Sequence, residues 1–144
     1  MKLYRINIDG NIDGMDFKDE IMTDVCNAAK LMYDKNGYVE PWINYVAVKD
    51  ATVCGTCGFK FPLADNQVEI TYSTFPELEG REIGAEMVSH LVRIAFEKMN
   101  GVKIIAKSHP ESIAHVKTLE RLNFKKISEY IHPDGSQMWE WHLN

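Results

Sequence analysis

The sequence lacks several features that mark specialised classes of protein. It carries 16 lysines and arginines against 21 aspartates and glutamates, for a net charge of −5, and it has no basic run. This balance argues against a nucleic-acid binder and mildly favours cationic partners such as amines. No stretch approaches the ~18 consecutive apolar residues of a membrane span. The opening segment "MKLYRINIDG" lacks the apolar core of a signal peptide. We expect a cytoplasmic protein that binds neither nucleic acid nor membrane.

Cysteine is also scarce, and the three cysteines do not form a metal or redox motif. Cys26, Cys54 and Cys57 cannot all pair, which agrees with a reducing compartment. The segment "CGTC" is one CxxC without a second pair, whereas a structural zinc ion takes four ligands. The five histidines are scattered without the spacing of metal ligands. Residues three apart in a strand point to opposite faces, so we expect a structural role for Cys54 and Cys57 and no metal site.

The sequence does have the length and composition of one globular domain. Its 144 residues are 45% apolar and 26% charged, which is ordinary for a chain that buries a core. We find no internal repeat, linker or low-complexity tract, and we expect a single domain over residues 1–144.

Apolar periodicity predicts an α/β domain with a mixed sheet. Asp50 and Ala51 are the expected turn of a hairpin, Gly37 ends the first helix, and Pro110 suits the first turn of the last helix. In chain order the expected elements are a strand over 2–8, a helix over 16–37, strands over 43–50, 51–61 and 67–75, a helix over 83–99, a strand over 102–107, a helix after Pro110, and strands over 124–131 and 136–143.

The segment from Pro76 to Met87, "PELEGREIGAEM", combines two opposing signals. A glycine-spaced turn leads directly into an amphipathic helix, which is the usual construction of an anion-binding site. The free N–H groups and the dipole of a helix start favour an anion there. Glu77, Glu79 and Glu82, however, place negative charges where the anion would lie. Whether this turn binds a phosphate therefore depends on its context.

With its flanking strand and helix, this segment resembles a known motif. "VEITYSTFPELEGREIGAEMVSHLVRIAF" is similar to the central motif of the GNAT superfamily of N-acetyltransferases, most closely to the branch that includes ribosomal-protein-alanine acetyltransferases. "VCGTCGFKFPLADNQVEITY" upstream, "PESIAHVKTLERLNF" downstream and the final tryptophan-containing strand resemble neighbouring parts of that branch. The similarity covers residues 42–144. It implies an α/β (α+β) fold with a mixed, mostly antiparallel, twisted sheet flanked by helices.

The resemblance also implies a binding site for acetyl-CoA as the acetyl donor. In this family the strand before the loop splays from its neighbour, and its free backbone groups pair with the pantetheine arm. The loop and the start of the following helix hold the pyrophosphate. The cofactor-binding residues implied here are Ser73, Thr74, Phe75, Glu79, Gly80, Arg81, Glu82, Ile83, Gly84, Ala85, Ser112 and His115.

The loop departs from the family pattern Arg/Gln-x-x-Gly-x-Gly/Ala, because here it is Glu79-Gly80-Arg81-Glu82-Ile83-Gly84. The donors are backbone amides, so a glutamate side chain that points to solvent leaves them free, and an acidic residue in the first turn also stabilises a helix. Two nearby carboxylates still repel a pyrophosphate, by about 1 kcal/mol each at a screened surface, and Arg81 offsets one of them. Two outcomes stay open: a weakened site that binds, and a loop that no longer binds.

Acetyl transfer to an amine requires a base, because the attacking nitrogen must be neutral. An alkylammonium has a pKa near ~10.4, so a side chain or a water relay must remove its proton. Glu69 is the candidate base, since alternate strand residues share a face and Glu69 lines up with Thr71 and Ser73. This polar row indicates a cleft; the alternative is a solvated sheet face without a catalytic role.

The leaving thiolate needs a proton, and the acceptor needs a pocket. Many family members place a tyrosine at the position of Leu119 as the proton donor, and leucine cannot do this. We expect water, Ser112 or His115 to supply the proton here. Among the aromatic residues, Trp42 and Tyr72 are the candidates that contact the acceptor.

The sequence therefore predicts an acetyl-CoA-dependent N-acetyltransferase that acts directly on a primary amine, either a small molecule or a protein N-terminus. One alternative is another acyl-CoA donor. The other is a degenerate GNAT fold that binds CoA or a protein partner without catalysis, which Glu79, Glu82 and Leu119 motivate. The fold alone does not identify the acceptor. A homodimer is the common default for the oligomeric state.

Overall fold

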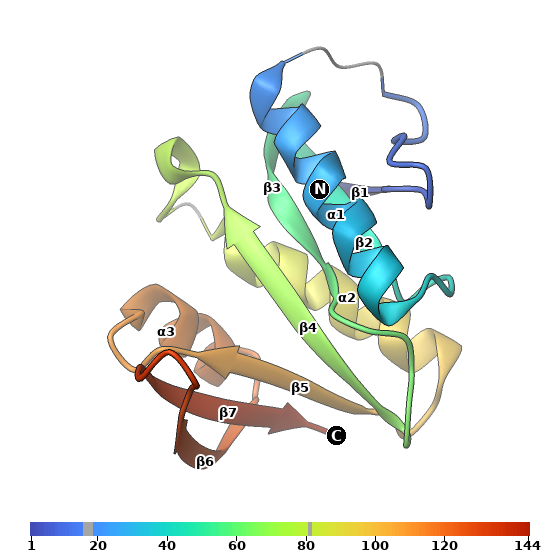
Figure 1. The fold of residues 1–144 in the computed structure, drawn as a ribbon. Coiled ribbons are helices and arrows are strands. Elements are labelled where there is room, and N and C mark those ends of the chain that lie inside the picture. The colour runs from blue at the N-terminus through green and yellow to red at the C-terminus, as the bar shows by residue number, and fades with distance from the viewer. Residues whose placement is uncertain (16–18, 81) are drawn as a thin grey trace.

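One seven-stranded sheet with helices on both faces forms the structure (Figure 1). It is a computed structural model that describes residues 1–15, 19–80 and 82–144. The elements in chain order are β1 (Lys2–Arg5), α1 (Glu20–Asn36), β2 (Asn44–Lys49), β3 (Thr52–Phe59), β4 (Gln67–Thr74), the short 3-10 helix η1 (Pro76–Leu78), α2 (Ile83–Lys98), β5 (Lys103–Ser108), α3 (Ile113–Arg121), β6 (Lys125–Ile131) and β7 (Gln137–Leu143).

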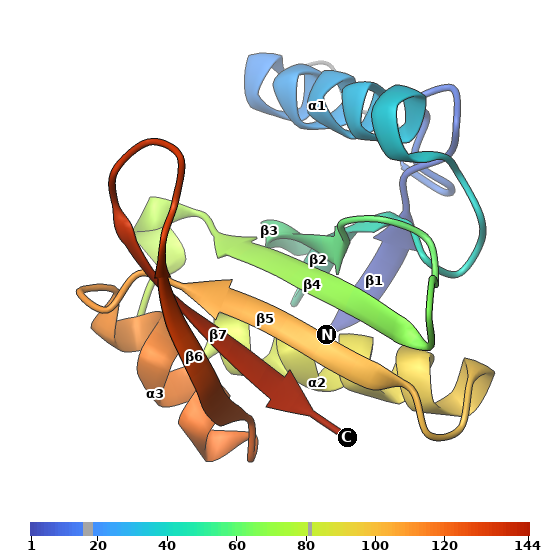
Figure 2. The same ribbon diagram turned by 60° about the horizontal axis from the view of Figure 1, so that its bottom comes forward.

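The sheet is mixed but mostly antiparallel, so the predicted fold class is confirmed. The strand order is β1-β2-β3-β4-β5-β7-β6, and β4 with β5 is the parallel pair. Figure 2 shows α1 on one face of the sheet and α2 with α3 on the other, with the β6–β7 loop rising on the α1 side. None of the helices in the described ranges is long and apolar enough to cross a membrane.

The parallel pair opens into a fork. Strand β4 pairs with β5 only at Gln67, Val68 and Glu69, and the last pairing is Glu69 with Ile105. Beyond this point β4 keeps its pairing with β3 up to Thr74, so its other edge is left without a neighbouring strand. The divergence of the two arrows is visible in Figure 1. This fork places unpaired backbone in the middle of the sheet, where a sheet normally has none.

Several predicted boundaries shift, each for a local reason. The first strand ends at Arg5 because the chain turns back, and Ile6 forms an isolated bridge with Ile12. The last helix begins at Ile113 rather than at Pro110, since Ser112 donates its N–H to the carbonyl of His109 and closes a turn first.

Other predicted boundaries hold. The hairpin does turn at Asp50 and Ala51, whose φ angles of 52° and 62° suit a tight two-residue turn. Helix α1 begins at Glu20, where Asp19 accepts a hydrogen bond from the N–H of Met22 at 2.7 Å. Its predicted first residues, 16–18, lie outside the described residues.

A buried tyrosine ties α1 to the sheet. The hydroxyl of Tyr33 donates to the carbonyl oxygen of Ile6 at 2.7 Å and accepts from the N–H of Asn44 at 2.9 Å. Both partners are backbone groups in the buried layer between α1 and the strands. Burying these groups without a partner is costly, so the hydroxyl fixes where α1 lies over the sheet.

We therefore expect Tyr33→Phe to lower the free energy of unfolding by about 1–3 kcal/mol, because it leaves the N–H of Asn44 and the carbonyl of Ile6 without their partner. Urea unfolding followed by circular dichroism measures the loss. Tyr130→Phe is the matched control, since the Tyr130 hydroxyl makes no hydrogen bond within residues 1–15, 19–80 and 82–144. Equal stability of Tyr33→Phe and the wild type would contradict the anchoring role.

Candidate active site

Two cavities lie on opposite faces of the sheet and meet at the fork. The larger, about 640 Å³, lies on the side of α2 and α3, and we call it the α3 cavity. The smaller, about 430 Å³, lies against the strand face that carries Glu69, and we call it the Glu69 cavity. Tyr72 and His115 line both. A molecule bound in one cavity therefore approaches a molecule bound in the other through the gap between β4 and β5.

The α3 cavity contains most of the residues that the sequence predicted for a cofactor. Those that line it are Ser73, Thr74, Glu79, Gly80, Glu82, Gly84, Ala85, Ser112 and His115. Phe75 and Ile83 are not among its lining residues: Ile83 is buried in the core, and the N–H of Phe75 is already bonded to the carbonyl of Cys54 at 2.9 Å. The prediction for Arg81 falls outside the described residues.

Sequence reasoning missed most of the residues that α3 supplies to this cavity. Besides the predicted positions, Ala114, Lys117, Thr118 and Arg121 line it. Steps of three residues from the predicted His115 lead to Thr118 and Arg121, and steps of four lead back from these to Ala114 and Lys117. The helical period counted from His115 could therefore have identified this face.

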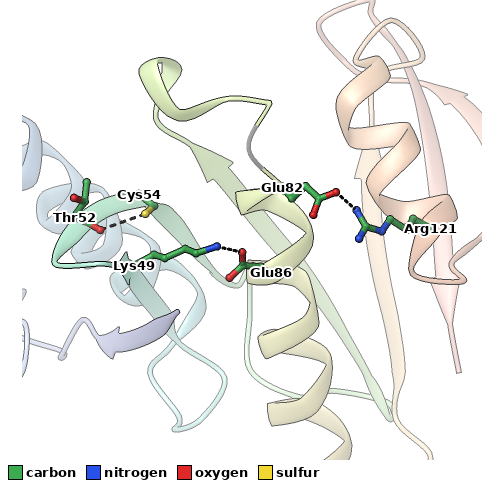
Figure 3. Close-up of polar contacts among 6 residues, drawn as sticks. All are labelled: Lys49, Thr52, Cys54, Glu82, Glu86 and Arg121. Atoms are coloured by element: carbon green, nitrogen blue, oxygen red, sulfur yellow. Dashed lines mark hydrogen bonds and ion pairs between the residues drawn. The ribbon is translucent and has the colours of Figure 1, made fainter.

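The start of α2 is arranged unusually. Glu82 is the N-cap with a left-handed φ of 61°, and its side chain makes no capping hydrogen bond. The carboxylate instead reaches α3 and accepts from Nη1 of Arg121 at 2.7 Å (Figure 3). Glu82 thus lies at the N-cap of α2, and the acidic residue within the first turn is Glu86. The carboxylate of Glu86 pairs with Lys49 of β2, and Glu86 does not line the α3 cavity.

The charges of the described residues that line the α3 cavity balance. Glu79 and Glu82 supply two negative charges, and Lys117 and Arg121 supply two positive ones. The acidic loop is therefore opposed by basic residues from a helix more than thirty positions further along the chain. The first N–H groups of α2 have no partners within the helix. This combination leaves the helix start able to accept an anion.

Glu69 lies at the base of the fork on the other face. Its side chain is 8% exposed, and it faces two lysines: Oε1 lies 3.2 Å from Nζ of Lys107, and Oε2 lies 3.7 Å from Nζ of Lys60. Lys60 directly follows β3, and its backbone N–H donates to the carbonyl of Glu69 at 2.8 Å. The predicted alignment holds in part, since Thr71 lines the same cavity but Ser73 lines the α3 cavity.

Tyr72 stands between the two cavities with an unsatisfied hydroxyl. Its oxygen is buried and has no hydrogen-bond partner in the described part of the chain. The ring lies 4.8 Å from the ring of His115, centroid to centroid. Burial raises the pKa of Tyr72, so the phenol stays protonated at neutral pH. Burial also lowers the pKa of His115, partly opposed by Glu79, which favours its neutral imidazole.

The remaining predicted positions lie in the core. Trp42 is 4% exposed and packs edge-on against Phe59, so its position does not fit a contact with an acceptor in either cavity. Leu119 is fully buried. Cys54 and Cys57 are buried free thiols, and Cys54 donates to the carbonyl of Thr52 at 3.2 Å (Figure 3). No group of residues able to hold a metal ion occurs in the described ranges.

Comparison with known proteins identifies the family. A family model described as an acetyltransferase (GNAT) domain matches residues 14–125. A curated relative, an uncharacterized N-acetyltransferase of Bacillus licheniformis, is 35% identical over 75 residues, or 51% of this chain. The match spans 42% of that relative, less than half of its length.

Solved structures share the fold at low identity. A mutant spermidine N-acetyltransferase of Vibrio cholerae gives a TM-score of 0.67 at 13% identity, over 96% of this chain and 86% of that one. The ribosomal-protein-alanine N-acetyltransferase of Escherichia coli gives 0.64 at 12%, over 89% and 90%. A putative acetyltransferase of Salmonella typhimurium, solved with its cofactor acetyl-CoA, gives 0.62 at 14%, over 92% and 76%.

The chain belongs to the GNAT acetyltransferase family. The narrower resemblance to the ribosomal-protein-alanine branch is not singled out, because members with different acceptors give similar scores.

The buried thiols lead to a simple expectation. The thiolate is the reactive form, and burial raises the pKa of Cys57 to about 12 and also raises that of Cys26. We expect a chromogenic disulfide reagent to label the native protein slowly and all three cysteines rapidly in denaturant. Rapid labelling of Cys54 or Cys57 in the native state would show that the thiols of "CGTC" are accessible to reagents and are not part of the core.

Proposed function

We propose that the protein transfers an acetyl group from acetyl-CoA to a primary amine. The observation that carries this proposal is the meeting of two cavities at the fork between β4 and β5. An acyl donor held on the α3 side lies within reach of an amine held on the Glu69 side. Membership of the family supports the same reaction class.

The residues of the α3 cavity fit an acyl-CoA. The edge of β4 beyond Glu69 offers backbone groups to an extended amide chain, and the start of α2 favours a phosphate. Lys117 and Arg121 offset the two glutamates of the loop. Bound here, acetyl-CoA would supply a thioester as the activated acetyl donor. Of the two outcomes that the sequence left open, these contacts favour the site that still binds.

Glu69 is the group that would take the proton of the acceptor ammonium. Each of its oxygens faces one lysine, and a carboxylate has about four lone-pair positions, so capacity for the substrate N–H remains. Its position at the last β4–β5 pairing puts it beside the opening through which the amine must approach the thioester. Lys60 and Lys107 hold the side chain in one orientation.

Residues around the opening between β4 and β5 would donate a proton to the leaving thiolate. The buried hydroxyl of Tyr72 is protonated and has no hydrogen-bond partner among the described residues, and Tyr72 borders both cavities. Ser112 and His115 line the α3 cavity nearby. Because Leu119 cannot donate a proton, one of these three groups, or water, takes the role that family members give to a tyrosine at that position.

The acetyl-CoA site can be tested by thermal unfolding. A ligand at 100 times its dissociation constant adds about 2.7 kcal/mol to the folded state, which raises the melting temperature by several degrees. Ala114→Trp should abolish the shift, because Ala114 is an exposed residue of α3 that lines the cavity. Glu120→Trp, on the same helix but outside the cavity lining, should keep it. No shift of the wild type at millimolar acetyl-CoA would support the degenerate, non-catalytic alternative.

The role of Glu69 is tested separately. We expect Glu69→Gln to lower kcat/KM by roughly 10²–10⁴-fold, since a carboxamide cannot accept the proton. The melting-temperature shift with acetyl-CoA should persist, because Glu69 lies outside the α3 cavity. Glu140→Gln is the matched control, a half-buried glutamate of β7 that hydrogen-bonds His142. Unchanged turnover in Glu69→Gln would remove the residue from the mechanism while leaving the family assignment intact.

A further inference from the structure

The Glu69 cavity has a charge that the overall composition does not suggest. Lys60 and Lys107 line it together with Glu69, which leaves an excess of one positive charge when the histidines are neutral. Glu69 is the only carboxylate among its lining residues in the described part of the chain. Glu140 pairs with Lys107 in register on β7, but it is not among the lining residues, and its carboxylate is bonded to Nε2 of His142 at 2.7 Å.

Both lysines keep hydrogen-bonding capacity toward the cavity. An ammonium group has three donors, and each lysine makes one ion pair with Glu69. The side chain of Lys60 is 48% exposed and that of Lys107 is 30% exposed, whereas that of Glu69 is almost fully buried. The lysines are therefore the charged groups that an incoming molecule meets first, and Glu69 lies behind them.

We propose that the acceptor is a small amine that carries an acidic group a few bonds from its nitrogen, and that Lys60 and Lys107 bind this acidic group while Glu69 binds the amine. The proposal rests on the acetyl transfer proposed above and names its substrate class. Because both Nζ atoms lie within 3.7 Å of the Glu69 carboxylate, the amine and the acidic group must lie close together in the acceptor. An α- or β-amino acid and an aminoalkyl phosphate have this arrangement.

The same charges select against two other kinds of acceptor. A polyamine brings further ammonium groups into a cavity that already has a positive excess, and like charges at short range repel. A protein N-terminus has no carboxylate beside its amine, because that carboxyl group is part of the first peptide bond. Either acceptor leaves the two lysines without a partner. The cavity thus favours a free amino acid over both.

Matched acceptors test the proposal. Each amino acid of a panel is compared with its amide and with its decarboxylated amine, phosphoethanolamine is compared with ethanolamine, and spermidine is the polycation. Release of CoA in the presence of acetyl-CoA gives kcat/KM for each. We expect at least one acidic amine to exceed its uncharged partners by 10-fold or more. Comparison of kcat/KM between the amino acids and phosphoethanolamine shows whether a carboxylate or a phosphate is the preferred acidic group.

The other outcomes are distinct. If amides, simple amines or spermidine are acetylated as fast as every acidic amine, the proposed substrate class is wrong. The proposal of acetyl transfer is then unaffected. Transfer to none of these compounds, despite a melting-temperature shift with acetyl-CoA, would overturn both the substrate class and the catalytic proposal.

Variants locate the effect. Lys60→Gln and Lys107→Gln should each lower kcat/KM for the acidic amine at least 10-fold more than they lower kcat/KM for its amide, and the shift with acetyl-CoA should stay unchanged. Lys60→Arg should restore part of the loss, because it keeps the charge. Lys125→Gln, an exposed lysine of β6 outside the cavity, is the control. An equal loss for the acid and its amide would contradict binding of the acidic group by these lysines.

Discussion

The early end of the pairing between β4 and β5 is the constraint on which the rest of the site depends. Three pairs join the strands and then the pairing stops at Glu69 and Ile105. A continuous pair would satisfy its own backbone groups and close the sheet. Because the strands diverge, the middle of the sheet has an opening with backbone donors and acceptors along one edge. Tyr72 and His115 border this opening, and each cavity lies against one face of it.

Three carboxylates in or beside the site pair with cations from other elements of the fold. Glu82 pairs with Arg121 of α3, Glu86 with Lys49 of β2, and Glu69 with lysines that follow β3 and lie on β5. The pairs of Glu82 and Glu86 are partly exposed, so they add little to stability. Their effect is on the local field, since a cation beside an acidic side chain reduces the repulsion that this side chain exerts on an anion.

The sequence predicted the fold class, the order of the elements and most of the loop residues around the α3 cavity, because periodicity and motif spacing are local properties. It could not predict the partners of Glu82 or Glu69, which arise where separate elements come together. Arg121 is thirty-nine positions from Glu82. The expected contact of Trp42 with the acceptor fails for a related reason: the local sequence does not show which aromatic side chains are buried, and the indole of Trp42 packs on Phe59 in the core.

The net charge of the protein and the charge of the Glu69 cavity favour different kinds of acceptor. The overall charge of −5 attracts any amine to the molecule as a whole. At the cavity, however, the sign reverses, because two lysines surround one buried carboxylate. Long-range attraction speeds the approach of a cation, but it does not decide which cation fits. Discrimination is set at contact distance, where the solvent is mostly excluded and each unmatched charge is costly. The residues that set it, Lys60 and Lys107, lie outside the loop and helix that resemble the family motif, so acceptor choice can vary while the donor site is kept.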